Sequence, residues 1–419
     1  MRVWLGACNF HANFDTVFFS RMENGCRYEV GISQEPMTDH VLLDMIDRFL
    51  DGSIEVLCRS SQVCRDWNDA LSGNILWRTK LKSRFGKDPS LYHPKYRDLF
   101  DSTSTSGSES DLDLKEVYAA THVLERRFSR GTFTSRGRYF MDNPITCIGM
   151  SGSCAYVADS QGNLRKFDTS IIPDFEENKC HCLEFTSPVS SMITTDFGLK
   201  ATGHSDGTIR ASNSSLAVKS HEGRVNALVS VGESGVLSVS PRDASLALTD
   251  LVGNCVSQVR HLHVDSAPNT IACSDTNTTI AGCRDDACRI YDLRAPGGPV
   301  ALVALSDWCL CVESSGQNPY LFRASDKAVH LFDLRNPSGG PIETLHKSDR
   351  LVSKFRSDFS LRLVSCGLDG ELRISSLESQ QVVSLHSSED YILATDFDRT
   401  TLCCGGMNGK FEIFYFNDK

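Results

Sequence analysis

The sequence contains no long apolar run. The longest one, Val300 to Leu305, is far shorter than the roughly 18 residues that a transmembrane helix needs, so we expect no membrane-spanning segment. Positive charge is not in excess either, because 43 lysines and arginines are outnumbered by 53 aspartates and glutamates, which gives a net charge of −10. Neither nucleic acid nor a membrane surface is therefore an expected partner.

Secretion signals and metal-binding motifs are missing as well. The first apolar residues are followed by Asn9, His11 and Asn13, which is unlike the apolar stretch of a secretory leader. The 17 cysteines therefore predict reduced thiols in an intracellular protein, located in the cytoplasm, the nucleus or both. No CxxC pair occurs, and Cys180-His181-Cys182 has no second ligand pair at zinc spacing, so we expect neither a metal nor another cofactor.

The C-terminal two-thirds of the chain is filled by a repeat. In each copy a turn residue is followed by alternating apolar and polar residues, then by an aromatic position and often an acid. These aromatic positions lie roughly 40 residues apart, which is a spacing typical of repeat folds. The seven copies read GNLRKFD (162–168), GTIRASN (207–213), ASLALTD (244–250), DACRIYD (286–292), KAVHLFD (327–333), GELRISS (370–376) and GKFEIFY (409–415).

A turn precedes each copy at a constant distance. The residue six places before the aromatic position is, in chain order, Gln161, Asp206, Asp243, Asp285, Asp326, Asp369 and Asn408. Asp-Gly or Asn-Gly between apolar runs predicts a β-hairpin with a type I′ turn, in which both central residues have positive φ. Within the copies, Leu164 and its counterparts should face one side of a strand, and Arg165, Arg210, Arg289, His330 and Arg373 the other.

Units of this length with four short strands are typical of propeller blades. The segment resembles the WD-repeat β-propeller family, with Phe167-Asp168, Tyr291-Asp292 and Phe332-Asp333 in place of Trp-Asp. His221, His346 and His386 resemble the family's Gly-His element. Three blades have Ser or Thr at the aromatic position, so the family's His–Ser–Asp–Trp hydrogen-bonded set should be incomplete.

The last unit ends too early to hold a fourth strand. The strand-like segment 131–140 precedes the first unit, and it should pair beside 409–416 and close the ring. The predicted fold is therefore mainly β, a seven-bladed WD-repeat β-propeller over 131–419, preceded by a small helical module and a helical linker.

The helical module covers residues 36–85, where apolar residues recur on one face of a helix. This stretch resembles an F-box. Pro36 stands at the family's start, and Val63-Cys64-Arg65-Asp66-Trp67-Asn68 and Leu76-Trp77-Arg78 match its two most recognisable elements. The resemblance implies an apolar interface to a Skp-type adaptor. Its contacts would be Pro36, Leu42, Leu43, Ile46, Phe49, Leu50, Leu57 and Trp77.

The remaining segments carry less information. Residues 1–35 show no clear period and receive no assignment. Residues 86–130 should form a helical linker that contains an acidic, serine-rich loop over 101–114, because a segment of this composition cannot bury a core. Ser108 and Ser110 each precede an acid by three residues, as in sites of acidophilic kinases, but an unmodified loop is the stronger interpretation.

No catalytic constellation is present. The sequence has no GxSxG, no phosphate-binding P-loop and no HExxH, and its His and Asp residues recur once per repeat, as turn and capping residues do. The arginines at 165, 210, 289 and 373 also repeat, so we expect them to pack over neighbouring strands rather than to bind phosphate. The chain is therefore expected to be a non-catalytic subunit.

Together the two resemblances imply the substrate-recognition subunit of an SCF-type cullin–RING ubiquitin ligase. The propeller would hold the protein substrate, with Arg224 and Arg350 as candidate contacts in loops on one face. Arginine suits phosphorylated or acidic segments. A neutral or C-terminal peptide motif is an equal alternative for this acidic chain.

Two rival interpretations remain open. Tyr291-Asp292-Leu293-Arg294 and Phe332-Asp333-Leu334-Arg335 resemble the WDxR element through which other WD-repeat receptors reach a different cullin adaptor. The chain could also be a scaffold without any ligase role.

Overall fold

The computed structural model describes residues 22–23, 26–27, 77, 81 and 114–417, except for the short gaps 170–180, 196–197, 213–216, 253–254, 296, 306, 315–319, 325–326, 359–361, 377–380 and 388–389. The chain divides into two compact units, Met1–Arg84 with Ser110–Lys115 and Phe85–Glu109 with Glu116–Lys419. In the first unit, β1 (Met22–Glu23) pairs with β2 (Cys26–Arg27).

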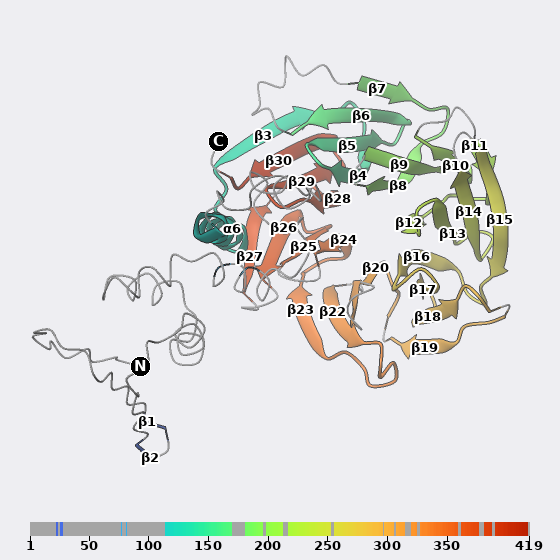
Figure 1. The fold of residues 1–419 in the computed structure, drawn as a ribbon. Helices are drawn as coiled ribbons and strands as arrows, with labels where there is room; N and C mark the ends of the chain where they lie inside the picture. The colour runs from blue at the N-terminus through green and yellow to red at the C-terminus, as the bar shows by residue number, and fades with distance from the viewer. Residues whose placement is uncertain are drawn as a thin grey trace, which may run out of the picture. The chain divides into compact units, whose positions relative to one another are not determined.

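The second unit contains a seven-bladed β-propeller, as predicted (Figure 1). Each blade is a four-stranded antiparallel sheet that runs from an innermost strand at the central axis to an outermost strand at the rim. In that order, the blades are β4 (Ile145–Ser151), β5 (Cys154–Asp159), β6 (Asn163–Asp168), β7 (His181–Glu184); β8 (Val189–Thr195), β9 (Gly198–His204), β10 (Thr208–Ala211), β11 (Ala217–Lys219); β12 (Ala227–Val231), β13 (Gly235–Ser240), β14 (Ser245–Val252), β15 (Cys255–His263); β16 (Pro268–Cys273), β17 (Thr278–Cys283), β18 (Ala287–Asp292), β19 (Ala301–Ala304); β20 (Cys311–Ser314), β21 (Tyr320–Ala324), β22 (Ala328–Asp333), β23 (Glu343–Lys347); β24 (Val352–Ser357), β25 (Arg362–Gly367), β26 (Glu371–Ser376), β27 (Val382–Ser387); and β28 (Ile392–Phe397), β29 (Thr401–Gly406), β30 (Lys410–Tyr415), β3 (Ser135–Phe140).

Blade 7 closes the ring with a strand that precedes blade 1 in the sequence, which confirms the predicted pairing of 131–140 with 409–416. Strand β3 pairs antiparallel with β30, from Ser135 opposite Tyr415 to Phe140 opposite Lys410. A buried carboxylate strengthens this pairing, because Glu412 of β30 is 2% exposed and accepts from Arg136 at 2.6 Å and Arg138 at 2.9 Å. Both arginines belong to the closing strand, so the ion pairs link the two ends of the propeller.

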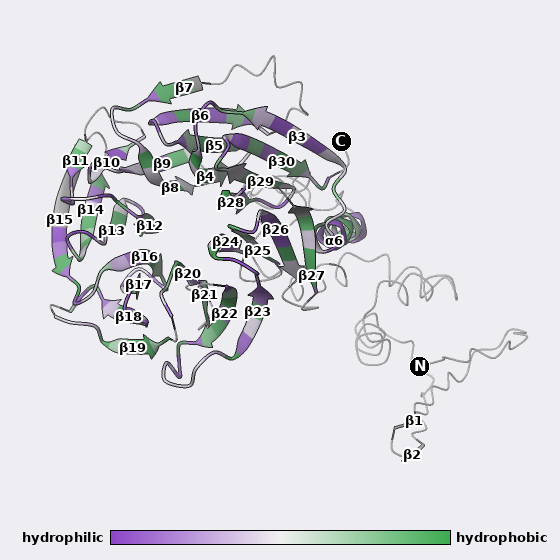
Figure 2. Cartoon of the chain, turned by 180° about the vertical axis from the view of Figure 1, so that it is seen from behind, coloured by the Kyte–Doolittle hydropathy of each residue, from purple (hydrophilic) through white to green (hydrophobic). Residues whose placement is uncertain are grey.

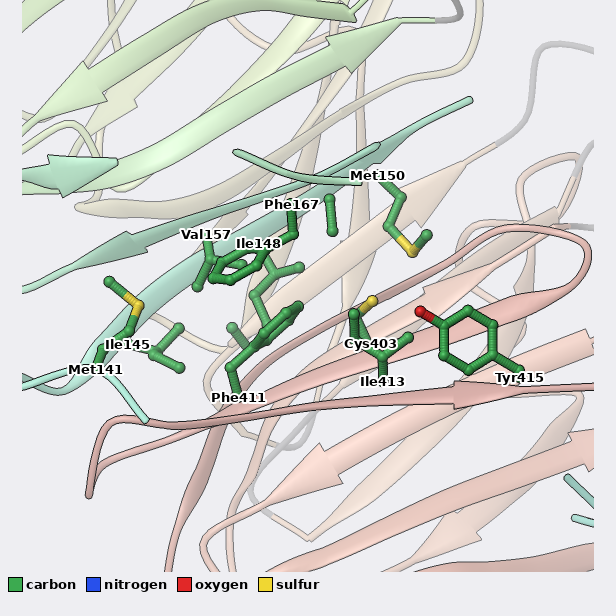
Figure 3. Packing of buried hydrophobic residues seen from close by; sticks show 12 residues of the cluster. Met141, Ile145, Ile148, Met150, Val157, Phe167, Cys403, Phe411, Ile413 and Tyr415 are labelled. Carbon is green, nitrogen blue, oxygen red and sulfur yellow. The ribbon is translucent and has the colours of Figure 1, made fainter. Parts of the chain in front are cut away.

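The repeat's alternation is visible in the burial of the third strands. The residues predicted to face one way are buried, with exposed fractions of 0–2% for Leu164, Ile209, Cys288, Val329, Leu372 and Phe411. Figure 2 shows hydrophobic and hydrophilic residues alternating along many strands. Figure 3 shows the buried cluster between blades 1 and 7, which includes Phe411 and in which the rings of Phe167 and Phe411 lie 4.9 Å apart.

The hairpin turns differ from the predicted type I′. Of the two residues predicted to be central, only the second has positive φ, as at Gly207 (+87°) and Gly409 (+77°), and even Ala244 (+46°) and Asp286 (+61°) adopt it. The amide of Gly207 donates to the carbonyl of His204 at 3.2 Å, which makes a type I turn followed by a left-handed residue. The preceding acid keeps an ordinary negative φ because its side chain bonds the backbone, as Asp206 does to the Thr208 amide at 3.0 Å.

Polar side chains at the start of the innermost strands join neighbouring blades. The hydroxyls of Thr146, Ser190 and Ser353 each donate to a backbone carbonyl of the next blade at 2.6 Å. Between blades 3 and 4 the Asn226 amide donates to the Asn269 side chain at 2.9 Å. These bonds fix the blades relative to one another around the axis.

The helix α6 (Leu114–Ser129) lies in the stretch predicted as a helical linker. Its C-terminal part packs on the propeller, because Leu124 and Phe128 share an apolar cluster with strands of blades 6 and 7. The Phe128 ring lies 4.4 Å from that of Phe416, and the guanidinium of Arg362 stacks on it at 4.1 Å. None of the helices in the described part of the chain is long and apolar enough to cross a membrane.

Gly409→Ala tests the closure of the ring. Gly409 has a φ of +77°, and a Cβ there would lie 2.1 Å from the carbonyl oxygen of Met141, the residue that follows β3. Gly152 also has positive φ (+52°), but a Cβ there would meet nothing within 4 Å. We expect Gly152→Ala to cost about 1 kcal/mol of unfolding free energy, and Gly409→Ala on the order of 3 kcal/mol or more. Equal losses in urea unfolding of the two variants would contradict the tight packing of this turn.

Candidate protein-binding face

One face of the propeller gathers two sets of loops. The loops that lead from an outermost strand to the next innermost strand, here called mouth loops, contact the hairpin turns between the second and third strands. Backbone bonds of 2.9–3.1 Å show the contact, because hairpin amides donate to the residue before the innermost strand in the pairs Ser160–Pro144, Ser205–Pro188, Arg284–Ala267, Leu368–Leu351 and Met407–Tyr391. We call this side of the propeller the mouth face.

Blade 3 holds its mouth loop with a histidine. His221 Nδ1 lies 3.0 Å from Asp243 Oδ2 in the hairpin turn, and Nε2 lies 2.8 Å from the Ser238 hydroxyl. Burial lowers the pKa of His221, although the charge of Asp243 opposes this. At the aromatic position, the hydroxyl of Thr249 lies 3.3 Å from the hydroxyl of Ser220. In blade 3, a threonine thus takes the place of the aromatic residue in the hydrogen-bonded set.

Other blades use serine for the same task. The hydroxyl of Ser348 donates to Asp369 of the blade 6 hairpin at 2.5 Å. His346, predicted as an equivalent of His221, lies in β23 and contacts Ser365 at 2.5 Å instead. His386 likewise lies in an outermost strand, β27. The predicted hydrogen-bonded set is thus incomplete in blade 6.

His221, Asp243 and His261 lie close enough to hold a metal ion, with one ligand atom of each within 4.8 Å of the others. The same atoms are already engaged in hydrogen bonds, however. His221 Nδ1 is bonded to Asp243, and His261 Nε2 lies 3.2 Å from both the Ser220 carbonyl and the Ser245 hydroxyl. We therefore assign this cluster to the connection between the mouth loop and its blade.

The structure places Arg224 and Arg350 on the mouth face, and both are exposed. It does not bring them together, because Arg224 precedes the innermost strand of blade 3 and Arg350 that of blade 6. The Arg350 guanidinium donates to the Tyr391 hydroxyl at 3.5 Å. One phosphate held between these two arginines is therefore not supported.

Lys354 is a cation that the sequence-based prediction missed. It lies in the innermost strand β24, and its charge and that of Arg224 both lower the pKa of the Cys147 thiol, although burial dominates and raises that pKa to about 12. A lysine inside the strand sequence Val-Ser-Lys-Phe-Arg-Ser was the available signal.

Three large apolar residues of the mouth face were also missed. Trp308 is 54% exposed, Met407 49% and Tyr391 37%. Two of them directly precede a buried residue at the start of an innermost strand, Cys309 after Trp308 and Ile392 after Tyr391. That position becomes recognisable only once the blades are aligned by their strands.

The repeated arginines of the third strands pack on protein, as predicted. The Arg165 guanidinium lies 5.4 Å from the centre of the Tyr139 ring. Arg373 forms ion pairs with Asp369 at 2.7 Å and Glu371 at 2.9 Å. These side chains are engaged within the blades and do not form a phosphate-binding patch.

The Tyr-Asp-Leu-Arg and Phe-Asp-Leu-Arg elements adopt the same geometry in two consecutive blades. Arg294 and Arg335 follow β18 and β22, and each folds back onto the aspartate two residues before it, at 2.8 Å from Asp292 and 2.6 Å from Asp333. The hydrogen bonds from Arg294 lower the pKa of Asp292 to about 2. Both guanidinium groups remain exposed, at 71% and 66%.

Most of the predicted adaptor contacts lie outside the described residues, namely Pro36, Leu42, Leu43, Ile46, Phe49, Leu50 and Leu57. Trp77 is described, is helical and is 2% exposed. Leu81 is likewise helical and 1% exposed.

Comparison with known proteins gives no further guide to this face, since no family model matches the chain and no curated protein matches its sequence.

Acid should loosen the blades through their buried histidines. Burial lowers the pKa of His346 to about 3, well below its usual value near 6.5. The unfolded chain therefore takes up a proton below pH ~6.5 that the folded chain does not, and stability falls as the pH drops from there towards 3, by up to ~1.4 kcal/mol per pH unit.

His346→Gln keeps a hydrogen-bonding side chain beside Ser365 but cannot be protonated. Urea unfolding at pH 7, 6 and 5 should therefore show a shallower loss of stability for this variant than for the natural chain. Parallel losses in the two proteins would show that His346 takes no part in the acid response.

Proposed function

We propose that the chain is the substrate-recognition subunit of an SCF-type cullin–RING ubiquitin ligase. In this role an F-box-like segment over 36–85 binds a Skp-type adaptor, and the propeller binds the protein substrate. The observation that carries the proposal is the order of the two parts, an F-box-like sequence followed by a closed seven-bladed propeller. A propeller of this kind is compatible with protein binding.

The mouth face supports a binding role for the propeller. Its loops are fixed by hydrogen bonds, for example between His221 and Asp243 and between Ser348 and Asp369. Exposed side chains such as Trp308 and Arg350 project from these fixed loops. Fixed loops lower the entropy cost of binding a partner.

The function would be positional rather than catalytic. The adaptor and cullin would hold the chain near a ubiquitin-charged conjugating enzyme, and the propeller would hold a substrate whose lysine is then at high effective concentration. No ubiquitin would pass through the chain's own cysteines. Burial raises the pKa of several of them, including Cys273 and Cys283 to about 11, which keeps these thiols protonated and poorly nucleophilic.

A second candidate is binding to a different cullin adaptor through Arg294 and Arg335. The observation in its favour is the matching geometry of the two elements in consecutive blades, with both guanidinium groups exposed. Each guanidinium is held by its own aspartate, so the pair would present a fixed arrangement to a partner.

The double change Leu42→Ala with Leu43→Ala tests the F-box assignment. Truncation of two apolar interface contacts commonly costs about 2–5 kcal/mol each, so recovery of the Skp adaptor with the purified chain should fall below detection. A matched control is Leu183→Ala with Leu302→Ala, because these leucines are 52% and 53% exposed on outermost strands of the propeller. This control should recover the adaptor as the natural chain does.

The arginine route is tested in the same experiment with Arg294→Ala and Arg335→Ala. If the F-box assignment is right, this variant still recovers the Skp adaptor. Recovery that survives the Leu42 and Leu43 changes, or no recovery by the natural chain, would refute the assignment. Loss of a different cullin adaptor from the arginine variant alone would support the second candidate.

A further inference from the structure

The mouth face has one equivalent position in every blade, directly before the buried residue at the start of the innermost strand. In most blades its carbonyl accepts the hairpin amide, as Pro144, Leu351 and Tyr391 show. In blade 3 the hairpin residue that would donate this bond is Pro241, which has no amide hydrogen, so the bond is not formed there. In blade order, the position holds Pro144, Pro188, Arg224, Ala267, Trp308, Leu351 and Tyr391.

Blades 5 to 7 therefore place a tryptophan, a leucine and a tyrosine side by side around the mouth. We call Trp308, Leu351 and Tyr391, together with Met407, the apolar arc. Met407 belongs to it because its amide donates to the Tyr391 carbonyl at 3.0 Å. Blades 1 to 4 place two prolines, an arginine and an alanine at the same position, so the apolar arc covers one side of the mouth only.

Among the described residues, the exposed large apolar side chains of the mouth loops and hairpin turns belong to this arc. The others lie on α6 or in, or just before, an outermost strand, and they are Val123, Phe133, Phe140, Leu183, Val300, Leu302, Ile342 and Val382. Trp308, Met407 and Tyr391 are 54%, 49% and 37% exposed. Tryptophan and tyrosine are the residues most enriched where a few side chains dominate a protein interface.

Hydrogen bonds hold the backbone at both aromatic residues, whose rings remain partly exposed. Asp307 Oδ1 accepts from the Trp308 amide at 2.7 Å, and Asp390 Oδ1 accepts from the Tyr391 amide at 2.8 Å. The guanidinium of Arg323, which is 1% exposed, donates to the carbonyls of Asp307 and Trp308. A buried charge thus fixes the loop that presents Trp308, and little conformational entropy is lost when a partner covers its ring.

Charge around the apolar arc decides between partners. Its three mouth loops carry Asp307, Asp349 and Asp390 against the guanidinium of Arg350, and the blade 5 hairpin adds the exposed Lys327. The guanidinium of Arg323 is buried beneath Trp308, so carboxylates outnumber the cations that a partner can reach. Carboxylates at each loop repel a phosphate and attract a lysine or arginine. Arg224, the other arginine considered for phosphate, lies at blade 3 on another part of the ring.

We propose that the apolar arc binds an extended, unphosphorylated peptide segment with an aromatic or aliphatic anchor residue next to a basic one. The anchor would cover Trp308 and Tyr391, and the basic residue would pair with the aspartates of the mouth loops. This inference rests on the proposed function, in which the mouth face holds the substrate, and it names the class of segment that a substrate must carry.

The test uses random peptides displayed on phage and selected on the purified full-length chain. Enriched peptides are then synthesised, and their affinities are measured by fluorescence anisotropy. We expect the enriched sequences to share an apolar anchor beside lysine or arginine. Trp308→Ala should weaken their binding about thirtyfold, as loss of a central interface tryptophan does. Asp349→Asn should weaken it severalfold, less than Trp308→Ala.

The matched control is Ile342→Ala, which removes an apolar side chain that is 56% exposed just before β23, at the end of blade 5 opposite the mouth face. This variant should bind the peptides as the natural chain does. The inference is overturned if no sequence is enriched, if the enriched peptides bind Trp308→Ala undiminished, or if phosphorylated versions of them bind more tightly.

Adaptor recovery separates this inference from the proposed function. Trp308→Ala should recover the Skp adaptor unchanged. If the adaptor is recovered but the peptides ignore Trp308, only the peptide class is wrong. If Trp308 governs peptide binding but the natural chain recovers no adaptor, the apolar arc stands and the ligase role falls.

Discussion

The pairing of β3 with β30 determines whether the seven sheets form a ring. Without β3, blade 7 would be a three-stranded sheet, and β30 would expose its outer edge to other chains. Glu412 adds charge to the backbone pairing, because its buried carboxylate accepts from Arg136 and Arg138 of β3 as well as from Lys410 of its own strand. The loops of the mouth face depend on this closure, since each is positioned by the blades on either side of it.

Charged groups of the innermost strands also join neighbouring blades across the closure, near the central axis. Arg356 of blade 6 bonds Glu313 of blade 5 at 3.0 Å and Asp396 of blade 7 at 2.9 Å, and Asp396 also accepts from the Met150 amide of blade 1 at 2.8 Å. Four consecutive blades, on both sides of the closure, are thus linked by one chain of ionic and hydrogen bonds. These are the blades that border or carry the apolar arc.

Blade number and closure could be predicted from the sequence because both follow from periodicity, a two-residue alternation within strands and a spacing of roughly 40 residues between turns. The turn type could not, because the side chain of an acid such as Asp206 favours a negative φ that Asp-Gly statistics do not reveal. His346 was matched to His221 by residue type, but mouth loops differ in length, so His346 falls inside β23 while Ser348 bonds the hairpin acid. The exposure of Trp308 on the mouth face could not be predicted, because its position in the blade is defined only by where the innermost strand begins.

If two parts of one chain bind two different proteins, hydrogen–deuterium exchange with and without the Skp adaptor should tell the two parts apart. The adaptor should slow exchange within 36–85 and leave exchange in the mouth loops and the hairpin turns unchanged. Protection at Asp292–Arg294 and Asp333–Arg335, or no protection anywhere in the chain, would contradict this division of roles.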